Sequence, residues 1–322
     1  MKKPSLLLLA LLALPCASAL AQNYPARPVR MVVGFPPGGG TDVVARIIAP
    51  GLSENLGQPV VIENRPGATG TVAAAMVAKS PADGYTIMMG HVSVNAIAPS
   101  LFPNLPYDVF KDFAPVTLAA SVPHFVVVHP SLPVNSIREL IAYSNERPGK
   151  LSFPSAGNAS TPHLAGEIFK SMTGVNLVHV PYKGSGQSMA DLLAGQHQVA
   201  FDTAAASAGY VRSGRMRVLG VSSAKRVPEY PDVPTVAEAG VPGYEVITWY
   251  GVFAPGGTPP AIVNRLHAEI AKAMEVPATR ARLAEAGADG TVTRSPEEFA
   301  AIVRSDTARY AKIIKDAGLK ID

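Results

Sequence analysis

Short apolar runs rich in β-branched residues alternate with longer amphipathic stretches along most of this chain, and proline or glycine marks nearly every junction. Pro81-Ala82-Asp83-Gly84 and Pro255-Gly256-Gly257 are examples. This alternation predicts an α/β fold. The expected strands are residues 29–34, 60–64, 86–89, 125–129, 177–180, 199–202 and 218–221. The expected helices are residues 43–56, 71–78, 136–145, 162–172, 187–194, 260–274 and 296–317. Strands are expected to end near Gly240, which leaves a mainly helical last third.

The first strand-to-helix turn, residues 34–42, reads Gly-Phe-Pro-Pro-Gly-Gly-Gly-Thr-Asp. Its glycines let backbone N–H groups approach a ligand closely, and Thr41 or Asp42 is expected to cap the following helix. The N-terminal end of a helix attracts anions. This turn is therefore a candidate anion site.

A second turn of this kind, residues 155–161, reads Ser-Ala-Gly-Asn-Ala-Ser-Thr and follows the short apolar run 151–153. Two such turns on separate α/β units suggest a cleft that holds one acidic ligand from both sides. The alternative is that each turn only makes a tight connection.

Two nucleotide-binding motifs are excluded at the first turn. A phosphate-binding Walker loop needs Gly-Lys followed by Ser or Thr, but Gly40 is followed by Thr41 and Asp42. The dinucleotide fingerprint Gly-x-Gly-x-x-Gly fails because Val43 occupies the third glycine position.

The first residues resemble a secretory signal peptide. Lys2 and Lys3 precede an apolar stretch too short to span a bilayer, and Ala19-Leu20-Ala21 is a small-x-small cleavage site before Gln22. We therefore expect export with cleavage after Ala21. The only cysteine, Cys16, lies inside this segment, where lipid attachment is a less favoured alternative. The mature chain would have no disulfide and would depend on a large packed core.

Removing residues 1–21 from the 322 leaves 301, enough for two domains. No later apolar run has the length, about 20 residues, that a spanning helix needs. Without Lys2 and Lys3, the 28 basic residues fall to 26 against 24 acidic ones, a net charge of +2. Such a balance gives no reason to expect nucleic-acid or membrane-surface binding.

Several motifs occur together and in order, and their combination carries a resemblance. They are Gly34 to Asp42, Glu63-Asn64-Arg65-Pro66-Gly67-Ala68, Pro81 to Thr86, Ser155-Ala156-Gly157-Asn158, Val180-Pro181-Tyr182-Lys183-Gly184 and Pro234 to Gly240. The mature chain resembles the Bug family of extracytoplasmic solute receptors, the substrate-binding components of tripartite tricarboxylate transporters. The resemblance implies a two-domain α/β periplasmic binding protein of type II, with a hinge and two chain crossings. Domain 1 would comprise residues 22–122 plus 245–322, and domain 2 residues 123–244.

The resemblance also implies a binding mode. A ligand carboxylate would lie between the two turns, held largely by main-chain donors and ordered water. The implied positions are Phe35, Pro36, Gly39, Thr41 and Asp42 in one domain and Ser155, Ala156, Gly157, Asn158 and Ser160 in the other. Ala159 stands where a glycine is frequent, which implies a less close backbone approach there. The partners would be a small carboxylate and membrane permease subunits, with a monomeric receptor and no cofactor or metal.

Other candidates have two interpretations each. His91, Ser93 and Asn95 follow an expected strand and would either face the cleft or serve as turn and cap residues. Asp202 ends another strand and either accepts a ligand ammonium or, as is more usual, caps the next helix.

The aromatic and basic candidates also have two interpretations each. Tyr182 and Lys183 would cover a second acidic group, or Lys183 would be a solvated turn residue. Trp249 and Tyr250, on the return crossing, form either a cleft wall or hinge packing.

No motif supports catalysis. The seven histidines show no metal-binding spacing, and no Gly-x-Ser-x-Gly elbow is present. A Ser-His-Asp group assembled by the fold is the remaining enzymatic alternative. A third possibility is a signalling receptor that presents its closed form to a sensor kinase. We predict a non-enzymatic receptor for a small carboxylate that works by hinge closure.

Overall fold

The computed structural model describes residues 24–102 and 104–316. The expected signal peptide, Cys16 and the expected end of the last helix at residue 317 lie outside these ranges. The described strands are β1 (Val29–Val33), β2 (Val60–Asn64), β3 (Thr86–His91), β4 (Phe113–Val128), β5 (Leu151–Ser155), β6 (Leu177–Pro181), β7 (Val199–Thr203), β8 (Arg217–Val221) and β9 (Ile247–Pro255).

The helices cover the strands on both sides. They are α1 (Gly40–Leu56), α2 (Thr71–Ala78), α3 (Ala98–Leu101), α4 (Ile137–Asn145), α5 (Thr161–Thr173), α6 (Ser185–Leu193), α7 (Ala204–Arg212), α8 (Pro260–Glu275), α9 (Pro277–Glu285) and α10 (Pro296–Asp316). A 3₁₀ turn (Ala68–Gly70) precedes α2, and a π-helical turn (Ser93–Ile97) follows β3. The α/β class predicted from the alternation is confirmed.

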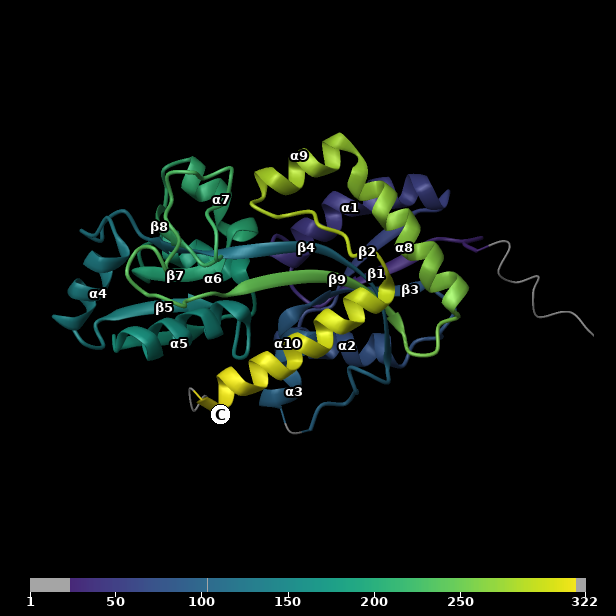
Figure 1. Cartoon of the computed structure of the whole chain (residues 1–322), viewed down its shortest axis with the longest axis horizontal. Helices are drawn as coiled ribbons and strands as arrows, with labels where there is room; N and C mark the ends of the chain where they lie inside the picture. Colours follow the sequence, from purple (N-terminus) through teal and green to yellow (C-terminus); the bar gives the residue numbers. More distant parts are fainter. Residues whose placement is uncertain (1–23, 103, 317–322) are drawn as a thin grey trace, which may run out of the picture.

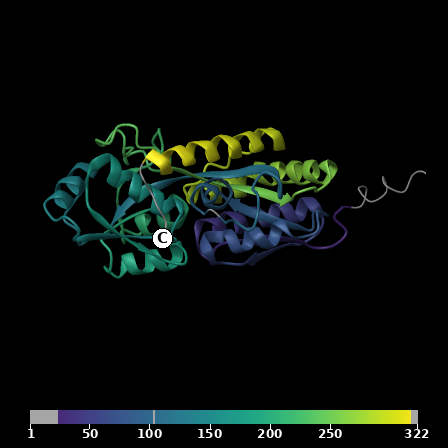
Figure 2. The ribbon, with the colours of Figure 1, turned by 90° about the horizontal axis from the view of Figure 1, so that it is seen from below.

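Two lobes lie side by side along the long axis of the molecule (Figures 1 and 2). The first lobe contains β1 to β3 with α1, α2, α3, α8, α9 and α10, and the second contains β5 to β8 with α4 to α7. β4 leads from the first lobe to the second, and β9 returns. The chain therefore crosses twice, and these two strands form the hinge.

Strand pairing shows how one sheet continues through both lobes. Its order is β2-β1-β3-β9-β4-β7, with β8 also paired to β4. β1 is parallel to β2 and β3, whereas β9 is antiparallel to β3 and β4. The first part of β4 pairs with β9, and its end, from His124 to Val128, pairs with β7. β5 and β6 form a separate parallel pair.

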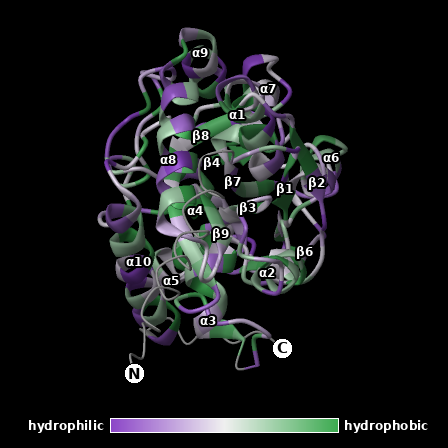
Figure 3. Ribbon diagram, turned by 90° about the vertical axis from the view of Figure 1, so that its right-hand side faces the viewer, coloured by the Kyte–Doolittle hydropathy of each residue, from purple (hydrophilic) through white to green (hydrophobic). Residues whose placement is uncertain are grey.

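The two hydrophobic cores meet across β4. Phe125 and Val127 belong to a cluster that fills the first lobe and continues into the second, where it includes Leu192 of α6 and Ala208 of α7. Val126 and Val128 belong to a second cluster that lies within the second lobe. Successive side chains of a strand point to opposite faces, so one strand joins both cores. Viewed along the long axis, apolar strands lie inside helices whose outer sides are hydrophilic (Figure 3).

One expectation about the last third is wrong. β9 is a fully formed central strand beyond Gly240, and α7 and α9 were also not expected. β4 also begins at Phe113, well before the expected start at Phe125. Central strands buried on both sides read as continuous apolar runs without alternation, which makes the period-2 signal weak.

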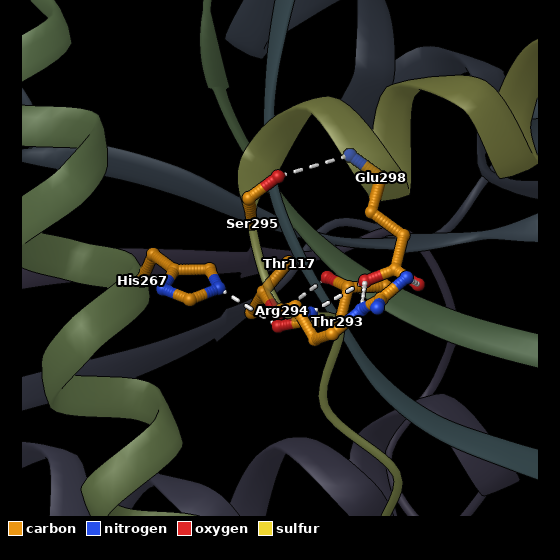
Figure 4. A network of polar contacts seen from close by, with 6 residues as sticks. All are labelled: Thr117, His267, Thr293, Arg294, Ser295 and Glu298. Carbon is orange, nitrogen blue, oxygen red and sulfur yellow. Dashed lines mark hydrogen bonds and ion pairs between the residues drawn. The ribbon is translucent and has the colours of Figure 1, made fainter.

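The segment after α9 is fastened to the first lobe by polar contacts (Figure 4). The Nε2 of His267, on α8, lies 2.9 Å from the carbonyl oxygen of Thr293, and the hydroxyl groups of Thr293 and Thr117 are 3.1 Å apart. The Arg294 N–H donates to the Glu298 carboxylate at the start of α10. These contacts hold the start of α10 next to β4, one of the two hinge strands.

Candidate ligand-binding site

A small, partly enclosed cavity of about 20 Å³ lies between the two lobes. Its walls come from the starts of helices α1, α5 and α6 and from the ends of strands β3 and β7, with β9 beside them. The lining residues are Phe35, Pro36, Gly39, Gly40, Thr41, His91, Ala156, Ser160, Thr161, Pro162, Ser185, Gly186, Asp202, Thr203 and Tyr250. The cavity thus brings together nine of the residues that sequence reasoning proposed.

The first turn delivers backbone donors to this cavity. α1 begins at Gly40 with Gly39 as its N-cap, and no side chain caps it. The first N–H groups of a helix have no partner within the helix. The expectation that Thr41 or Asp42 caps this helix is therefore wrong, because both lie inside its first turn.

Asp42 does not line the cavity. Its carboxylate accepts hydrogen bonds from the Gly38 N–H at 3.0 Å, from Arg46 at 2.9 Å and from Asn64 at 2.9 Å. Burial alone would raise the pKa of Asp42, but these hydrogen bonds hold it below its ordinary value. Asp42 therefore shapes the turn, and we correct its assignment as a ligand contact.

The start of α1 requires glycine for a spatial reason. A Cβ at Gly40 would lie 2.3 Å from the Tyr250 hydroxyl oxygen and 3.0 Å from the Thr203 hydroxyl. Tyr250 forms a wall of the cavity, whereas Trp249 donates to Asp306 of α10 at 2.7 Å and serves as packing.

The second turn is held by two stacked imidazoles. Ser155 is fully buried, and its hydroxyl lies 2.7 Å from His179 Nε2 and accepts from the Gly157 N–H. His163 stacks on His179 with ring centroids 3.9 Å apart, and its Nδ1 accepts from the Ala159 N–H at 3.3 Å. Ser155 thus fixes the turn from behind rather than lining the cavity.

Ser160 and Ala159 set the start of α5. Ser160 is the N-cap, with its hydroxyl accepting from the His163 N–H at 3.3 Å, and it lines the cavity. Ala159 has φ of +64°, a left-handed conformation that favours glycine. A glycine would adopt this conformation with less strain than alanine.

A third helix start, at α6, was missed. Ser185 and Gly186 line the cavity, and Ser185 donates its hydroxyl to Asp202 Oδ1 at 3.0 Å. The sequence did contain the signal for a third unit of this kind, because an apolar strand is followed by a Tyr-Lys-Gly turn and an amphipathic stretch. The helix, however, was expected to begin two residues later than it does.

Asp202 is buried and does not cap the helix that follows it. Thr203 is the N-cap of α7, and no side chain caps that helix. Asp202 is 0 % exposed, and its Oδ1 accepts from the Thr203 N–H at 2.7 Å. The favoured interpretation as a helix cap is therefore wrong.

The residues after β3 have different roles. His91 lines the cavity with its ring against Phe35 and Tyr250, and burial lowers its pKa to about 3. Ser93 is buried outside the lining and accepts from the Thr161 N–H of the second lobe at 3.0 Å. Asn95 accepts from the His91 N–H and so fixes the turn.

The remaining candidates line an adjoining open groove of about 660 Å³. Gly157, Asn158, Tyr182 and Lys183 lie there, and Phe35, Pro36 and Ala156 separate groove and cavity. The Tyr182 hydroxyl donates to Asp191 at 2.6 Å, away from the cavity. Across the groove the Thr69 hydroxyl donates to the Asn158 carbonyl oxygen at 2.6 Å.

The chemistry of the cavity favours a small polar anion. Three helix N-termini meet there, and no lysine or arginine is among the lining residues that the structure describes. Each helix end stabilises an anion by about 0.3–1 kcal/mol when exposed and up to about 2 when partly buried. Within residues 24–102 and 104–316, no group of three or more His, Cys, Asp or Glu side chains could hold a metal ion. In the same part of the chain, no helix combines the length and hydropathy that crossing a bilayer requires.

Two lobes joined by two crossing strands, with a polar cavity between them, define the class of hinged solute-binding proteins. The sequence matches the family described as "Tripartite tricarboxylate transporter family receptor" over residues 44–319, and the chain belongs to that family. It is therefore a solute-binding receptor rather than an enzyme, and the resemblance seen in the sequence is confirmed.

Relatives and solved structures agree with this membership. The protein BugT of Bordetella pertussis is 38% identical over 306 residues, 95% of this chain and 94% of BugT. The structure of Rpa4515 from R. palustris with adipate has a TM-score of 0.90 at 42% identity, covering 92% of this chain and 99% of that one. MatC (Rpa3494) from Rhodopseudomonas palustris with bound malate has a TM-score of 0.86 at 34% identity, covering 90% and 100%.

Proposed function

We propose that this receptor captures a small carboxylate in the cavity between its lobes. The observation that carries the proposal is the meeting of the α1, α5 and α6 N-termini in a small space whose described lining has no lysine or arginine. Backbone N–H groups and helix dipoles then supply the positive potential. Closing the lobes around the ligand removes water and stabilises the closed population.

The proposed contacts follow from the lining. Gly39, Gly40 and Thr41 approach the carboxylate from the first lobe, and Ala156, Ser160, Ser185 and Gly186 approach from the second. Phe35, Pro36 and His91 form the surrounding wall. Gly157, Asn158 and Tyr182 are placed to meet the far end of a longer ligand in the groove.

The ligand class that we favour is an aliphatic dicarboxylate. The related structures contain adipate and malate, which share a terminal carboxylate and differ in length and substituents. The small cavity fits one carboxylate, and the adjoining groove leaves room for chains of different length.

The same proposal includes the context of the receptor. We place domain 1 at residues 22–122 plus 245–322 and domain 2 at residues 123–244, because β4 and β9 cross between the lobes near these bounds. The mature protein, cleaved after Ala21, would work in the periplasm as a monomer and deliver its ligand to membrane permease subunits.

Thermal denaturation with matched ligands tests the binding mode. Selective binding to the native state raises the melting temperature. We expect adipate or malate to raise it, and adipamide and malamide to leave it unchanged, because the amides have no anionic end for the helix N-termini. Equal shifts with acid and amide would contradict the proposal, and so would the absence of any shift with both acids.

A further inference from the structure

Asp202 is the one acidic side chain among the described lining residues, and half of its carboxylate is unpaired. Oδ1 accepts from the Ser185 hydroxyl at 3.0 Å and from the Thr203 N–H at 2.7 Å. Oδ2 is buried and has no hydrogen-bond partner among the described residues. A buried polar atom without a partner is costly, so Oδ2 calls for a partner from the cavity itself.

No cation faces Asp202 from the elements packed around it. β9 contributes Tyr250, and β3 contributes His91. β4 contributes Phe125, directly paired with Asp202, and the buried His124. Burial lowers the pKa of His91 to about 3 and that of His124 to about 4, so both imidazoles are neutral near pH 7.

The other surrounding helices bring no free charge to this point. α1 presents Gly40 and Thr41, α6 presents Ser185 and Gly186, and α7 begins with Ala204. α5 presents Thr161 and His163, whose pKa burial lowers. Most charged groups of these elements are paired elsewhere, as Asp42 with Arg46, Glu167 with Lys170, Asp191 with Tyr182, and Arg212 with the Glu285 carbonyl. Glu54 is exposed in the last turn of α1, at the opposite end from the cavity.

A ligand carboxylate and an ionised Asp202 would therefore share one small cavity without an intervening cation. Two such groups in a desolvated site do not both remain ionised, because each disfavours the charge of the other. Burial already raises the pKa of Asp202 to about 6. A second negative charge beside it raises that pKa further.

We infer that the receptor binds its carboxylate together with one proton, which Asp202 carries on Oδ2 and donates to a ligand oxygen. The inference rests on the proposed function and specifies its chemistry. The proton comes from solvent, and no covalent bond other than O–H forms. The site would consequently prefer a ligand oxygen over an ammonium at this position.

The sign of the pH dependence follows from linkage. The complex has a higher Asp202 pKa than the free protein, so binding takes up a proton at pH values between the two. Affinity should fall as pH rises, by up to about tenfold per unit between about pH 6.5 and 8.5, where aliphatic carboxylates remain ionised.

Isothermal titration of the full mature protein with adipate and with malate tests this inference. Titrations near neutral pH in buffers of different ionisation enthalpy give the number of protons taken up per ligand. We expect a value approaching one, with the affinity falling as pH rises. Proton uptake near zero, with affinity independent of pH, would overturn the inference while leaving carboxylate binding intact. If neither acid binds, the proposed function fails as well.

Asp202→Asn provides the matched variant. Its amide keeps the acceptor for Ser185 and Thr203 and presents N–H donors at the position of Oδ2. We expect this variant to bind the same acid with no pH dependence. Glu269→Gln removes another buried carboxylate, on α8 and outside the cavity lining, and should keep the wild-type slope. An Asp202→Asn variant that binds the same acid at least tenfold more weakly than the wild type at every pH would contradict the inference. The buffer titrations on the wild type decide the question even if the variant does not fold.

Discussion

Single residues define the cavity by the space they leave free. Gly40 is the first residue of α1, and the Tyr250 hydroxyl occupies the position next to its Cα. Gly39, by contrast, has φ of −77°, and a Cβ there would meet only the Pro36 carbonyl oxygen at 3.6 Å. Gly40 is therefore the more constrained of the two glycines at the turn.

We predict that Gly40→Ala weakens carboxylate binding, because the methyl group pushes the start of α1 away from Tyr250 and Thr203. Overpacking of this kind costs about 1–3 kcal/mol, which corresponds to roughly fivefold to 150-fold in affinity. Gly209→Ala is the matched control, since Gly209 is also helical and a Cβ there meets nothing within 4 Å. Calorimetric titration of both variants checks this. Wild-type affinity in Gly40→Ala would show that α1 does not approach the ligand.

Sequence reasoning located the turns better than it oriented their side chains. Thr41 and Ser160 line the cavity, whereas Asp42 and Ser155 turn away into hydrogen bonds that fix the backbone. All four are small polar residues of the two strand-to-helix segments, and no local pattern separates the two pairs. Their direction depends on partners distant in the chain, such as Asn64 and His179.

At the scale of elements, the 3₁₀ turn before α2 reaches across the groove to the second lobe. Ala68 and Thr69 have φ of 43° and 53°, a left-handed conformation that is unusual for residues other than glycine. This conformation places the Thr69 hydroxyl 2.6 Å from the Asn158 carbonyl oxygen. The hydrogen bond joins the lobes directly at the edge of the site.

We predict that Thr69→Val speeds ligand release several-fold. Valine keeps the branched shape and removes only the hydroxyl, and one hydrogen bond contributes about 1 kcal/mol, or roughly fivefold in a rate or equilibrium constant. Thr173→Val makes the same change within α5, where the hydroxyl donates to Phe169. Stopped-flow release of the bound acid should separate the two variants. Equal release rates would mean that this contact does not hold the lobes together.

Helices and strands differed in how well they could be anticipated. Amphipathic helices such as α4, α8 and α10 fall within a residue or so of expectation, because they have a polar face that repeats with the helical period. β9 was missed because it lies between β3 and β4, where both faces are covered and Trp249, Tyr250 and Phe253 are all buried. Burial on both faces removes the alternation by which a strand is recognised.

For the whole molecule, the buried histidines at the hinge predict acid sensitivity. His91 and His124 have folded-state pKa values of about 3 and 4, below the ordinary 6.5, because burial disfavours the charged imidazole. The stability that these neutral histidines contribute is complete above about pH 6.5. It is lost as pH falls from 6.5 toward their folded-state pKa values. Asp202 acts oppositely, since its raised pKa of about 6 makes its ionisation unfavourable as pH rises.

We predict that the free energy of unfolding falls by roughly 3 kcal/mol or more between pH 6.5 and pH 4, because the two histidines outweigh Asp202. Urea unfolding at several pH values measures this. A stability that stays constant over this interval would show that the imidazoles are not buried in neutral form, and that the hinge is packed differently.

The central claim is that a carboxylate lies between the lobes where three helices begin, and a crystal structure of the protein with bound adipate or malate tests it most directly. We expect one carboxylate of the ligand within hydrogen-bonding distance of the first N–H groups of α1 and of α5 or α6, with an oxygen facing Asp202 Oδ2. A ligand confined to the groove, with its carboxylate paired to Lys183 and no contact to these helix starts, would contradict the claim.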